Sequence, residues 1–386
     1  MSLSIPLADV ADAWIGDLAR ATEIQALAQI AGATLLGERA LFADLPVPGL
    51  RSAGGGCRLY PTASGWIALT LARDDDRTLL PALLRTQDVA DADDEALATA
   101  FARQDAQALV AQGRALGLAI AAEDEIESAS PALVQLGDAP RAAPPGDMPR
   151  IVDLSALWAG PLCTHLLHLA DAQVTRIESV TRPDRMRDGR DSRLFSLLNQ
   201  GKVERQLDLR SAQGRSALFD LIDAADMVVA AARPRALAQL GLDPMGFVAG
   251  KPGRLWLTIT GHGADGDRAT WIGYGDDSAV AGGASAAMRG ATGEPGFIGD
   301  ALGDPLSGLY AARALSAAWR EGRGGAFILS MRGVVARAIA QAQARDASDF
   351  KAQLRCWRAA AGSPFPAVPA RDASTAPLLA AEPMPC

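Results

Sequence analysis

An aspartate directly before a proline, in the stretch ALGDPLSGLYAA at residues 301–312, is the first candidate for chemistry. Asp at the N-cap of a helix followed by Pro at the first helical position is an ordinary way to begin a helix. A carboxylate can also act as a nucleophile on a carbonyl carbon and form a covalent intermediate. Asp304 therefore has two open interpretations, a helix cap and a catalytic group, and its surroundings must decide between them.

Two further patterns could bind a cofactor or a metal ion. GHGADG at residues 261–266 matches the GxGxxG of dinucleotide-binding loops, but the following DRATW does not open a helix for the pyrophosphate. His165 and His168 are three residues apart on one predicted helix, and no carboxylate or cysteine joins them at a spacing typical of zinc sites. We therefore expect a glycine-rich turn at 261–266 and no metal. The lack of a GxSxG elbow after a strand disfavours a Ser-His-Asp hydrolase.

Basic residues recur where predicted strands end. They are Arg182, Arg185, Arg187, Lys202, Arg205, Arg210, Arg233 and Arg235. Each taken alone is typical of a solvated surface, but together at one edge of a sheet they could bind the phosphates of a large anionic ligand. The net charge of -8 disfavours nucleic acid as a partner, so local positive charge would have to bind such a ligand.

The overall composition is that of a globular protein with two domains. The 386 residues exceed what one hydrophobic core usually organises, and 49% of them are apolar. The four cysteines lie far apart without a CxxC pair, which gives no disulfide framework and fits a reducing cytoplasm. The N-terminus lacks a basic and apolar leader, and no segment reaches the roughly 20 apolar residues that span a bilayer. We expect a cytoplasmic protein that is neither exported nor inserted into a membrane.

The clearest boundary in the chain is the proline-rich stretch LGDAPRAAPPGDMPR. It divides a small α/β domain, 1–138, from a larger domain, 150–345, with a linker at 139–149 and an irregular tail at 346–386. In the small domain, GCRLYPTASGWIALTLA predicts two short strands around a turn. ALATAFARQDAQALVAQGRALG predicts one helix closed by glycine.

The larger domain alternates apolar strands with helices. Its first strands are RIVDLS, QVTRIES, DMVVAAA and RLWLTIT. Near-continuous apolar runs indicate strands buried on both faces, so the fold class is α/β with a doubly wound parallel, Rossmann-like sheet. A helix from Pro305 to about Glu321, the strand AFILSM and the helix VVARAIAQAQA follow. Ligands of such sheets bind beyond the carboxyl ends of the strands.

In their order, these segments resemble the family III CoA transferases, the group that contains formyl-CoA transferase, carnitine CoA-transferase and α-methylacyl-CoA racemase. IVDLSALWAGPLCTHLL is similar to the family's first strand and Gly-Pro helix, and FSLLNQGK to its Asn-x-x-Lys segment. LDLRSAQGRSALFDLIDAADMVVAAARPRALAQLGL, LWLTITGHGADG, YGDDSAVAGG and ALGDPLSGLYAARALSAAW continue the series through ILSMRGVVA. The resemblance implies the family's fold and an enzyme that moves CoA from an acyl-CoA donor to a carboxylic acid.

The resemblance assigns the nucleophile to Asp304, because the family carries an aspartate just before the helix that Pro305 opens here; Asp300 in FIGD is the weaker competitor. It implies an aspartyl anhydride and an aspartyl-CoA thioester, CoA and acyl-CoA as substrates, no tightly bound cofactor, and an interlocked homodimer. The CoA-binding residues that it implies are Trp158, Ala159, Gly160, Arg182, Arg210, Arg233 and Tyr274. Ser179 and Gln239 stand where many relatives carry basic residues, and Arg182 could compensate for the first.

One departure from the family concerns the order of the chain. Family members carry a glycine-rich loop and a Gly-Trp strand after the catalytic aspartate, whereas SAGGGCRLYPTASGWIALTLA comes before it here. This order predicts a circular permutation joined by the linker 139–149, with FPAVPAR similar to the family's returning tail. Gly54, Gly55 and Gly56 would form the flexible loop that shields the anhydride from water, and a merely glycine-rich turn is the alternative.

Two other functions stay open. Racemase members place a histidine before an aspartate as an acid and base for the α-proton, and this chain has Tyr274, Gly275 and Asp276 at that place. Tyrosine, with an ordinary pKa of about 10, is a poor base at neutral pH, so the sequence favours transfer over racemisation. The third interpretation is a non-catalytic CoA-binding homologue, with which Ser179 and Gln239 are compatible.

Overall fold

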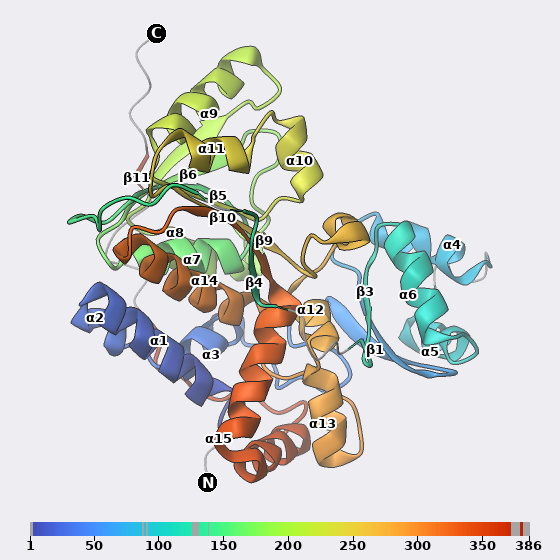
Figure 1. The fold of residues 1–386 in the computed structure, drawn as a ribbon. Coiled ribbons are helices and arrows are strands. Elements are labelled where there is room, and N and C mark those ends of the chain that lie inside the picture. The colour runs from blue at the N-terminus through green and yellow to red at the C-terminus, as the bar shows by residue number, and fades with distance from the viewer. Residues whose placement is uncertain are drawn as a thin grey trace.

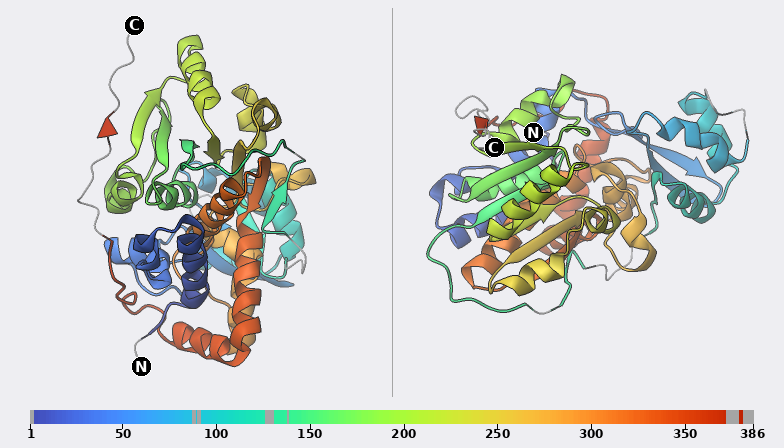
Figure 2. Two further views of the ribbon diagram at one scale, coloured as in Figure 1. Left: turned by 60° about the vertical axis from the view of Figure 1, so that its left-hand side comes forward. Right: turned by 90° about the horizontal axis from the view of Figure 1, so that it is seen from above.

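The computed structural model describes residues 3–86, 89, 92–125, 131–137, 139–371 and 379–380. Two β-sheets organise these residues, a small antiparallel sheet to one side and a large, mostly parallel sheet (Figures 1 and 2). Helices cover both faces of the large sheet, which is the central layer of the α/β fold. The predicted fold class, a doubly wound sheet with a smaller α/β part, is therefore confirmed.

The small sheet has the strand order β1-β2-β3, with the bounds Cys57–Thr62, Gly65–Thr70 and Ala119–Ala122. β1 and β2 form the predicted antiparallel hairpin. The short turn η1 (Asp76–Leu79) and the helices α4 (Leu80–Leu84), α5 (Asp94–Phe101) and α6 (Ala106–Ala115) complete this unit, which has a core of its own. The prediction of one helix over 96–117 is wrong, because the Asp105 carboxylate accepts the N–H of Ala108 and begins a new helix.

The large sheet has eight strands in the order β11-β7-β6-β5-β8-β9-β10-β4, and only the β10-β4 pair is antiparallel among the described residues. The bounds are Leu133–Gln135 (β4), Arg150–Leu154 (β5), Gln173–Ser179 (β6), Val203–Leu207 (β7), Met227–Ala230 (β8), Leu255–Thr260 (β9), Gly325–Ser330 (β10) and Leu379–Ala380 (β11). The five predicted strands β5, β6, β8, β9 and β10 are confirmed. β7 was missed, because its sequence VERQL is half-buried and makes no apolar run.

Two layers of helices cover the large sheet (Figure 1). On one face lie α7 (Ala159–His168), α8 (Ser192–Asn199) and α14 (Gly303–Arg320), with α1 (Ala8–Thr22), α2 (Gln25–Ala28) and α3 (Gly32–Phe42) outside them. On the other face lie α9 (Ala212–Ala224), α10 (Pro234–Gln239) and α11 (Pro244–Gly250). The turns η2 (Gly189–Asp191) and η3 (Gly266–Thr270) and the helices α12 (Gly275–Ala281), α13 (Ala284–Thr292) and α15 (Met331–Ala359) complete the fold.

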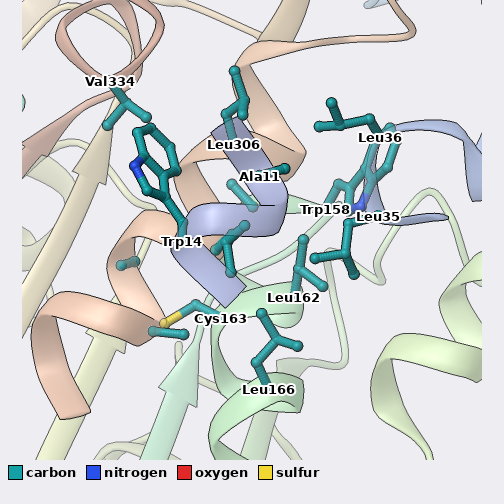
Figure 3. Packing of buried hydrophobic residues seen from close by; sticks show 14 of the residues in the cluster. Ala11, Trp14, Leu35, Leu36, Trp158, Leu162, Cys163, Leu166, Leu306 and Val334 are labelled. Atoms are coloured by element: carbon teal, nitrogen blue, oxygen red, sulfur yellow. The ribbon is translucent and has the colours of Figure 1, made fainter. Parts of the chain in front are cut away.

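The core between α1, α3, α7 and α14 consists of large apolar side chains (Figure 3). Trp14 of α1 and Trp158 just before α7 are both almost fully buried. Gly308 allows α7 and α14 to approach each other closely. A Cβ at this position would lie only 2.6 Å from the carbonyl oxygen of Ala159. This packing holds the start of α14, which carries Asp304, at a fixed position against the sheet.

The C-terminal segment differs from the predicted irregular tail. α15 continues to Ala359, because the Asp346 carboxylate at a kink accepts the N–H groups of Ser348 and Asp349 at 2.9 Å and starts the helix again. Beyond the helix, the chain returns to α3, where Thr34 donates to the carbonyl of Pro369 at 2.9 Å.

The division into 1–138, 139–149, 150–345 and 346–386 stays a prediction. The helices α1 and α3 contact α14 on the large sheet, so residues 8–42 are packed with the larger part of the chain. In the described part of the chain, no helix is long and apolar enough to cross a membrane.

Candidate active site

Asp304 lies near the start of α14, but it is not the cap of that helix. α14 begins at Gly303 with Leu302 as its N-cap, so Asp304 is the second helical residue. Its half-buried carboxylate accepts a hydrogen bond from the backbone N–H of Gly275, the first residue of α12. Of the two open interpretations, the helix cap is therefore excluded, and the side chain points to the start of a different helix.

Two glycines allow the starts of α12 and α14 to meet at Asp304. A Cβ at Gly275 would lie 2.2 Å from Oδ2 of Asp304, and a Cβ at Gly303 would lie 2.7 Å from the carbonyl oxygen of Gly275. Both distances are far shorter than a van der Waals contact, so any side chain at either position would push the helix starts apart. The position of the Asp304 carboxylate depends on these glycines.

Burial raises the pKa of Asp304 to about 7. The Arg39 guanidinium opposes this change, and the carboxylates of Asp277 and Asp300 add to it. A helix N-terminus favours a charged carboxylate, but burial and the neighbouring carboxylates outweigh this effect at Asp304.

A second carboxyl group, Asp276, lies beside Asp304 at the start of α12. Asp276 is half-buried, and burial together with Asp300 raises its pKa to about 7, while Arg39 and a hydrogen bond with Ser52 lower it. The Asp304 carboxylate also raises the pKa of Asp276. Near neutral pH, the site can therefore hold a carboxylic acid and a carboxylate side by side.

Arg39 of α3 is the main positive charge at these carboxyl groups. Its Nη1 lies 2.7 Å from Oδ1 of Asp300, which is fully buried, and its Nε lies 3.0 Å from Oδ1 of Asp191 in η2. Sequence reasoning missed Arg39, because no spacing relates it to a residue 261 positions away. It also assigned no role to Asp276, although the quoted segment YGDDSAVAGG contains it.

The glycine loop before β1 lies beside Arg39. A Cβ at Gly54 would lie 3.1 Å from a guanidinium nitrogen of Arg39, and the Gly54 carbonyl accepts a hydrogen bond from Arg190 at 3.1 Å. Gly55 and Gly56 are exposed, and Gly55 has a φ of 81°. The structure thus places the loop next to the carboxyl cluster, and its action as a shield stays a prediction.

The residues expected to bind CoA fall into two groups. Arg182, Arg210 and Arg233 are exposed and follow the carboxyl ends of β6, β7 and β8, while Tyr274 is half-buried directly before α12. Strand order makes β7, β6, β5 and β8 neighbours, so these arginines share one edge of the sheet.

Trp158, Ala159 and Gly160 form the second group, and all three residues are buried. Trp158 is 2% exposed and packs in the core among side chains of α3 and α7 (Figure 3). A Cβ at Gly160 would lie 2.1 Å from Oγ of Ser155, so packing alone requires glycine there. Contact between this segment and CoA would have to come from its backbone.

The Asn-x-x-Lys segment is a buried structural network. Nζ of Lys202 lies 2.8 Å from Oγ1 of Thr164, 3.0 Å from the carbonyl of Pro161, 3.2 Å from Oδ1 of Asn199 and 3.3 Å from Oδ2 of Asp153. Lys202 is fully buried, which lowers its pKa to about 8. Lys202 therefore ties β5, α7 and α8 together and does not meet a ligand at the surface.

The GHGADG segment does not open an α-helix, and the histidines pack within the fold. GHGADG ends in the 3-10 turn η3, and His262 is buried with Nε2 3.7 Å from Oδ2 of Asp277. His165 is buried, and Nδ1 of His168 lies 3.1 Å from the carbonyl of Ala172. Within the described residues, no three His, Cys, Asp or Glu side chains gather closely enough to hold a metal ion.

Comparison with known proteins identifies one protein family. The model described as CoA-transferase family III matches residues 149–376. An acyl-CoA transferase of Fusarium pseudograminearum is 30% identical over 45% of this chain and 42% of its own length. The succinyl-CoA–D-citramalate CoA-transferase of Chloroflexus aurantiacus is 30% identical over 47% of each chain. The succinate–glutarate CoA-transferase of Agrobacterium fabrum is 27% identical over 61% of this chain and 63% of its own length.

A solved structure shows a more distant similarity. The crystal structure of a CAIB/BAIF family protein from Brucella suis is 26% identical, with a TM-score of 0.42, over 52% of this chain and 57% of that chain. The chain spans about half the length of the curated relatives it matches.

Proposed function

The chain belongs to CoA-transferase family III, and we propose that it moves CoA from an acyl-CoA thioester to a carboxylic acid with Asp304 as the nucleophile. One observation carries the proposal: the half-buried Asp304 carboxylate is held by the N–H of Gly275 where α12 and α14 meet. With a pKa of about 7, a large share of this carboxyl group is ionised at neutral pH.

The proposed reaction alternates between two covalent forms of Asp304. The carboxylate attacks the thioester carbonyl, the C–S bond breaks, and a mixed anhydride and CoA thiolate form. The thiolate attacks the aspartyl carbonyl of the anhydride, which releases the donor acid and leaves an aspartyl-CoA thioester. The acceptor carboxylate then attacks this thioester, and the released thiolate takes the acceptor's acyl group from the second anhydride and regenerates Asp304.

This chain's residues would support these steps in three ways. The N–H of Gly275 donates to the Asp304 carboxylate and orients it. The loop of Gly54, Gly55 and Gly56 would keep water from the anhydride. Arg182, Arg210, Arg233 and Tyr274 at the sheet edge would bind the phosphates and the nucleotide of CoA.

The substrates and the assembly are also proposals. The relatives' names include succinyl-CoA, D-citramalate, succinate, glutarate and oxalate, so dicarboxylic acids are the first acceptors to test. We also propose a homodimer, as the family resemblance implies, which light scattering of the purified protein would check. The circular permutation stays a proposal as well.

Replacement of Asp304 by Ala tests the catalytic role. Asp304→Ala should abolish CoA exchange between succinyl-CoA and a panel of acids while CoA still binds, because the variant lacks only the nucleophile. Asp265→Ala is the matched control, since Asp265 is 71% exposed in its side chain and pairs only with Arg268 at the surface in the described residues.

Hydroxylamine added during turnover should convert residue 304 of the native protein to a hydroxamate that mass spectrometry detects. Full exchange activity in Asp304→Ala would refute the assignment.

Asp276 favours a second candidate, an acyl-CoA racemase or isomerase. Two adjacent carboxyl groups with pKa values of about 7 can serve as the acid and the base of a proton transfer. Deuterium uptake at the α-carbon of an acyl-CoA in D2O without any acceptor acid would support this function over transfer. Absence of both exchange and deuterium uptake, with CoA still bound, would indicate the non-catalytic homologue.

A further inference from the structure

We propose that Arg39 is a positioning residue of this site: its ion pair with the buried Asp300 limits the negative charge that Asp304 meets when it ionises as the nucleophile. This inference rests on the proposed function. Arg39 lies in the segment 1–148, which the family match does not cover. Arg39 would act through Asp300 and would not touch the substrate.

The geometry gives Asp300 one strong cationic partner. Asp300 is 0% exposed, and its Oδ1 lies 2.7 Å from Nη1 of Arg39, while its Oδ2 has no hydrogen-bond partner among the described residues. A buried carboxylate without a paired charge is strongly unfavourable, and an arginine is charged at every relevant pH. The charge state of Asp300 therefore depends on Arg39.

The neighbours of the pair explain why its charge matters to Asp304. The charged and titratable groups around it come from α3, η2, α12, β1, α14 and the chain before α14. They are Arg39, Arg190, Asp191, Asp276, Asp277, Asp300, Asp304 and Cys57. Nε2 of His262 lies 3.7 Å from Oδ2 of Asp277. Five carboxyl groups face two arginines in this set, so loss of Arg39 removes one of the two positive charges that oppose them. Ionisation of Asp304 then becomes harder, because like charges at short range oppose it.

Arg39 also connects the carboxyl cluster with the glycine loop. The guanidinium is 15% exposed in its side chain and lies against Gly54, where a Cβ would come within 3.1 Å of it. Arg190 donates to the Gly54 carbonyl from the other side at 3.1 Å. Arg39 therefore links the buried Asp300 to the loop that is proposed to keep water from the anhydride.

Variants of Arg39 and Asp300 should move the ionisation of Asp304 in opposite directions. Arg39→Met removes the positive charge, so the acid limb of the exchange rate against pH should shift to higher pH, with about a tenfold loss of rate at pH 7 that recovers at higher pH. Asp300→Asn removes a negative charge, so the limb should shift to lower pH. Arg39→Met/Asp300→Asn should return toward the native profile, and Arg39→Lys should keep most of it. Arg20→Met is the control, because Arg20 is 74% exposed in its side chain.

A second measurement follows the charge of Asp304 without the transferase reaction. Carbodiimide reacts with the protonated carboxyl group, so mass spectrometry of residue 304 after labelling at several pH values reports its titration. The midpoint of labelling should rise in Arg39→Met and fall in Asp300→Asn. Asp300→Asn removes a buried charge and keeps the shape of the side chain, so it gives a result even if Arg39→Met does not fold.

The two proposals fail in different ways. Unchanged labelling midpoints and unshifted rate profiles in both variants would overturn the role of Arg39, even with full exchange activity in the native protein. An equal loss of rate at every pH in Arg39→Met, with an unmoved midpoint, would also overturn it, because that is the result of a purely structural role. Shifted midpoints in a protein that exchanges no CoA would instead remove the proposed function and leave the charge coupling standing.

Discussion

Two buried charge clusters of this protein have opposite properties. The Lys202 cluster contains a fully buried Lys and a fully buried Asp153, and four oxygen atoms surround the ammonium group at 2.8 to 3.3 Å. The Asp304 cluster has Asp276, Asp300 and the half-buried nucleophile candidate Asp304 near Arg39, and one carboxylate oxygen of Asp300 has no hydrogen-bond partner in the described residues.

The two clusters differ in how completely their charged groups are paired and hydrogen-bonded. In a complete network every charge has its partners, so the network fixes three secondary-structure elements and leaves nothing for a substrate. In the incomplete cluster, burial and neighbouring carboxylates raise the pKa values of Asp276 and Asp304, and such shifted carboxyl groups are typical of functional sites. This contrast supports the proposal that the Asp304 cluster, and not the Lys202 cluster, carries the chemistry.

Removal of Lys202 should have the largest effect on stability. Lys202→Met leaves Asp153 buried without its cation, which costs about 3–5 kcal/mol of the free energy of unfolding. Urea denaturation followed by circular dichroism measures this loss. The control is Lys251→Met, because Lys251 is 56% exposed in its side chain and pairs with Asp226 at the surface, so a loss below about 1 kcal/mol is expected. Equal losses in the two variants would contradict the contrast between the clusters.

A methyl group at Gly275 should disturb the incomplete cluster directly. In Gly275→Ala the new Cβ would lie 2.2 Å from Oδ2 of Asp304, so the carboxylate or the helix starts must move. We expect a loss of about 1–3 kcal/mol in the free energy of unfolding from overpacking and roughly a 100-fold lower exchange rate, because the nucleophile is displaced.

Gly290→Ala in α13 is the matched control for this prediction. A Cβ at Gly290 meets nothing within 4 Å, so this variant should keep both stability and exchange rate. Native exchange kinetics in Gly275→Ala would show that the position of the Asp304 carboxylate does not limit the reaction.

The sequence predicted most of the large sheet, because strands that are buried on both faces consist of nearly continuous apolar runs. It missed β7, whose residues are half-buried, and it joined α5 and α6, because the cap made by Asp105 is visible only as one acidic residue in an alanine-rich stretch. The family resemblance assigned the nucleophile to Asp304. It did not predict the raised pKa of this group, because the burial of the carboxylate depends on how α12 and α14 meet.

Arg39 shows most clearly what a sequence does not contain. Its contact with Asp300 joins residues 261 positions apart, and it exists only because α3 packs beside α8 and α14. Asn199 and Lys202 show the converse case, since a conspicuous motif of the resemblance turned out to be buried and structural. The family resemblance pointed to one residue of each cluster, Asp304 and Lys202, but only partners and burial distinguished the two clusters.

The smallest expected effect is a gain of stability on neutralising Asp304, and its sign depends on pH. Burial raises the pKa of Asp304 from its ordinary value near 4 to about 7, so the folded protein binds a proton between these pH values that the unfolded chain releases. The free energy of unfolding therefore falls as pH rises from about 4 to about 7, and the loss is complete above pH 7. Three pKa units correspond to about 4 kcal/mol, and partial exposure of the half-buried carboxylate to water reduces this to about 1–2 kcal/mol. Asp304→Asn removes this loss, so the variant should be more stable than the native protein by about that amount at pH 8 and equally stable at pH 4. Urea denaturation at both pH values measures the difference, with Asp265→Asn at the surface as the control. A variant that is less stable than the native protein at pH 8 would show that the Asp304 carboxylate is satisfied like Asp153, and the contrast between the two clusters would then fail.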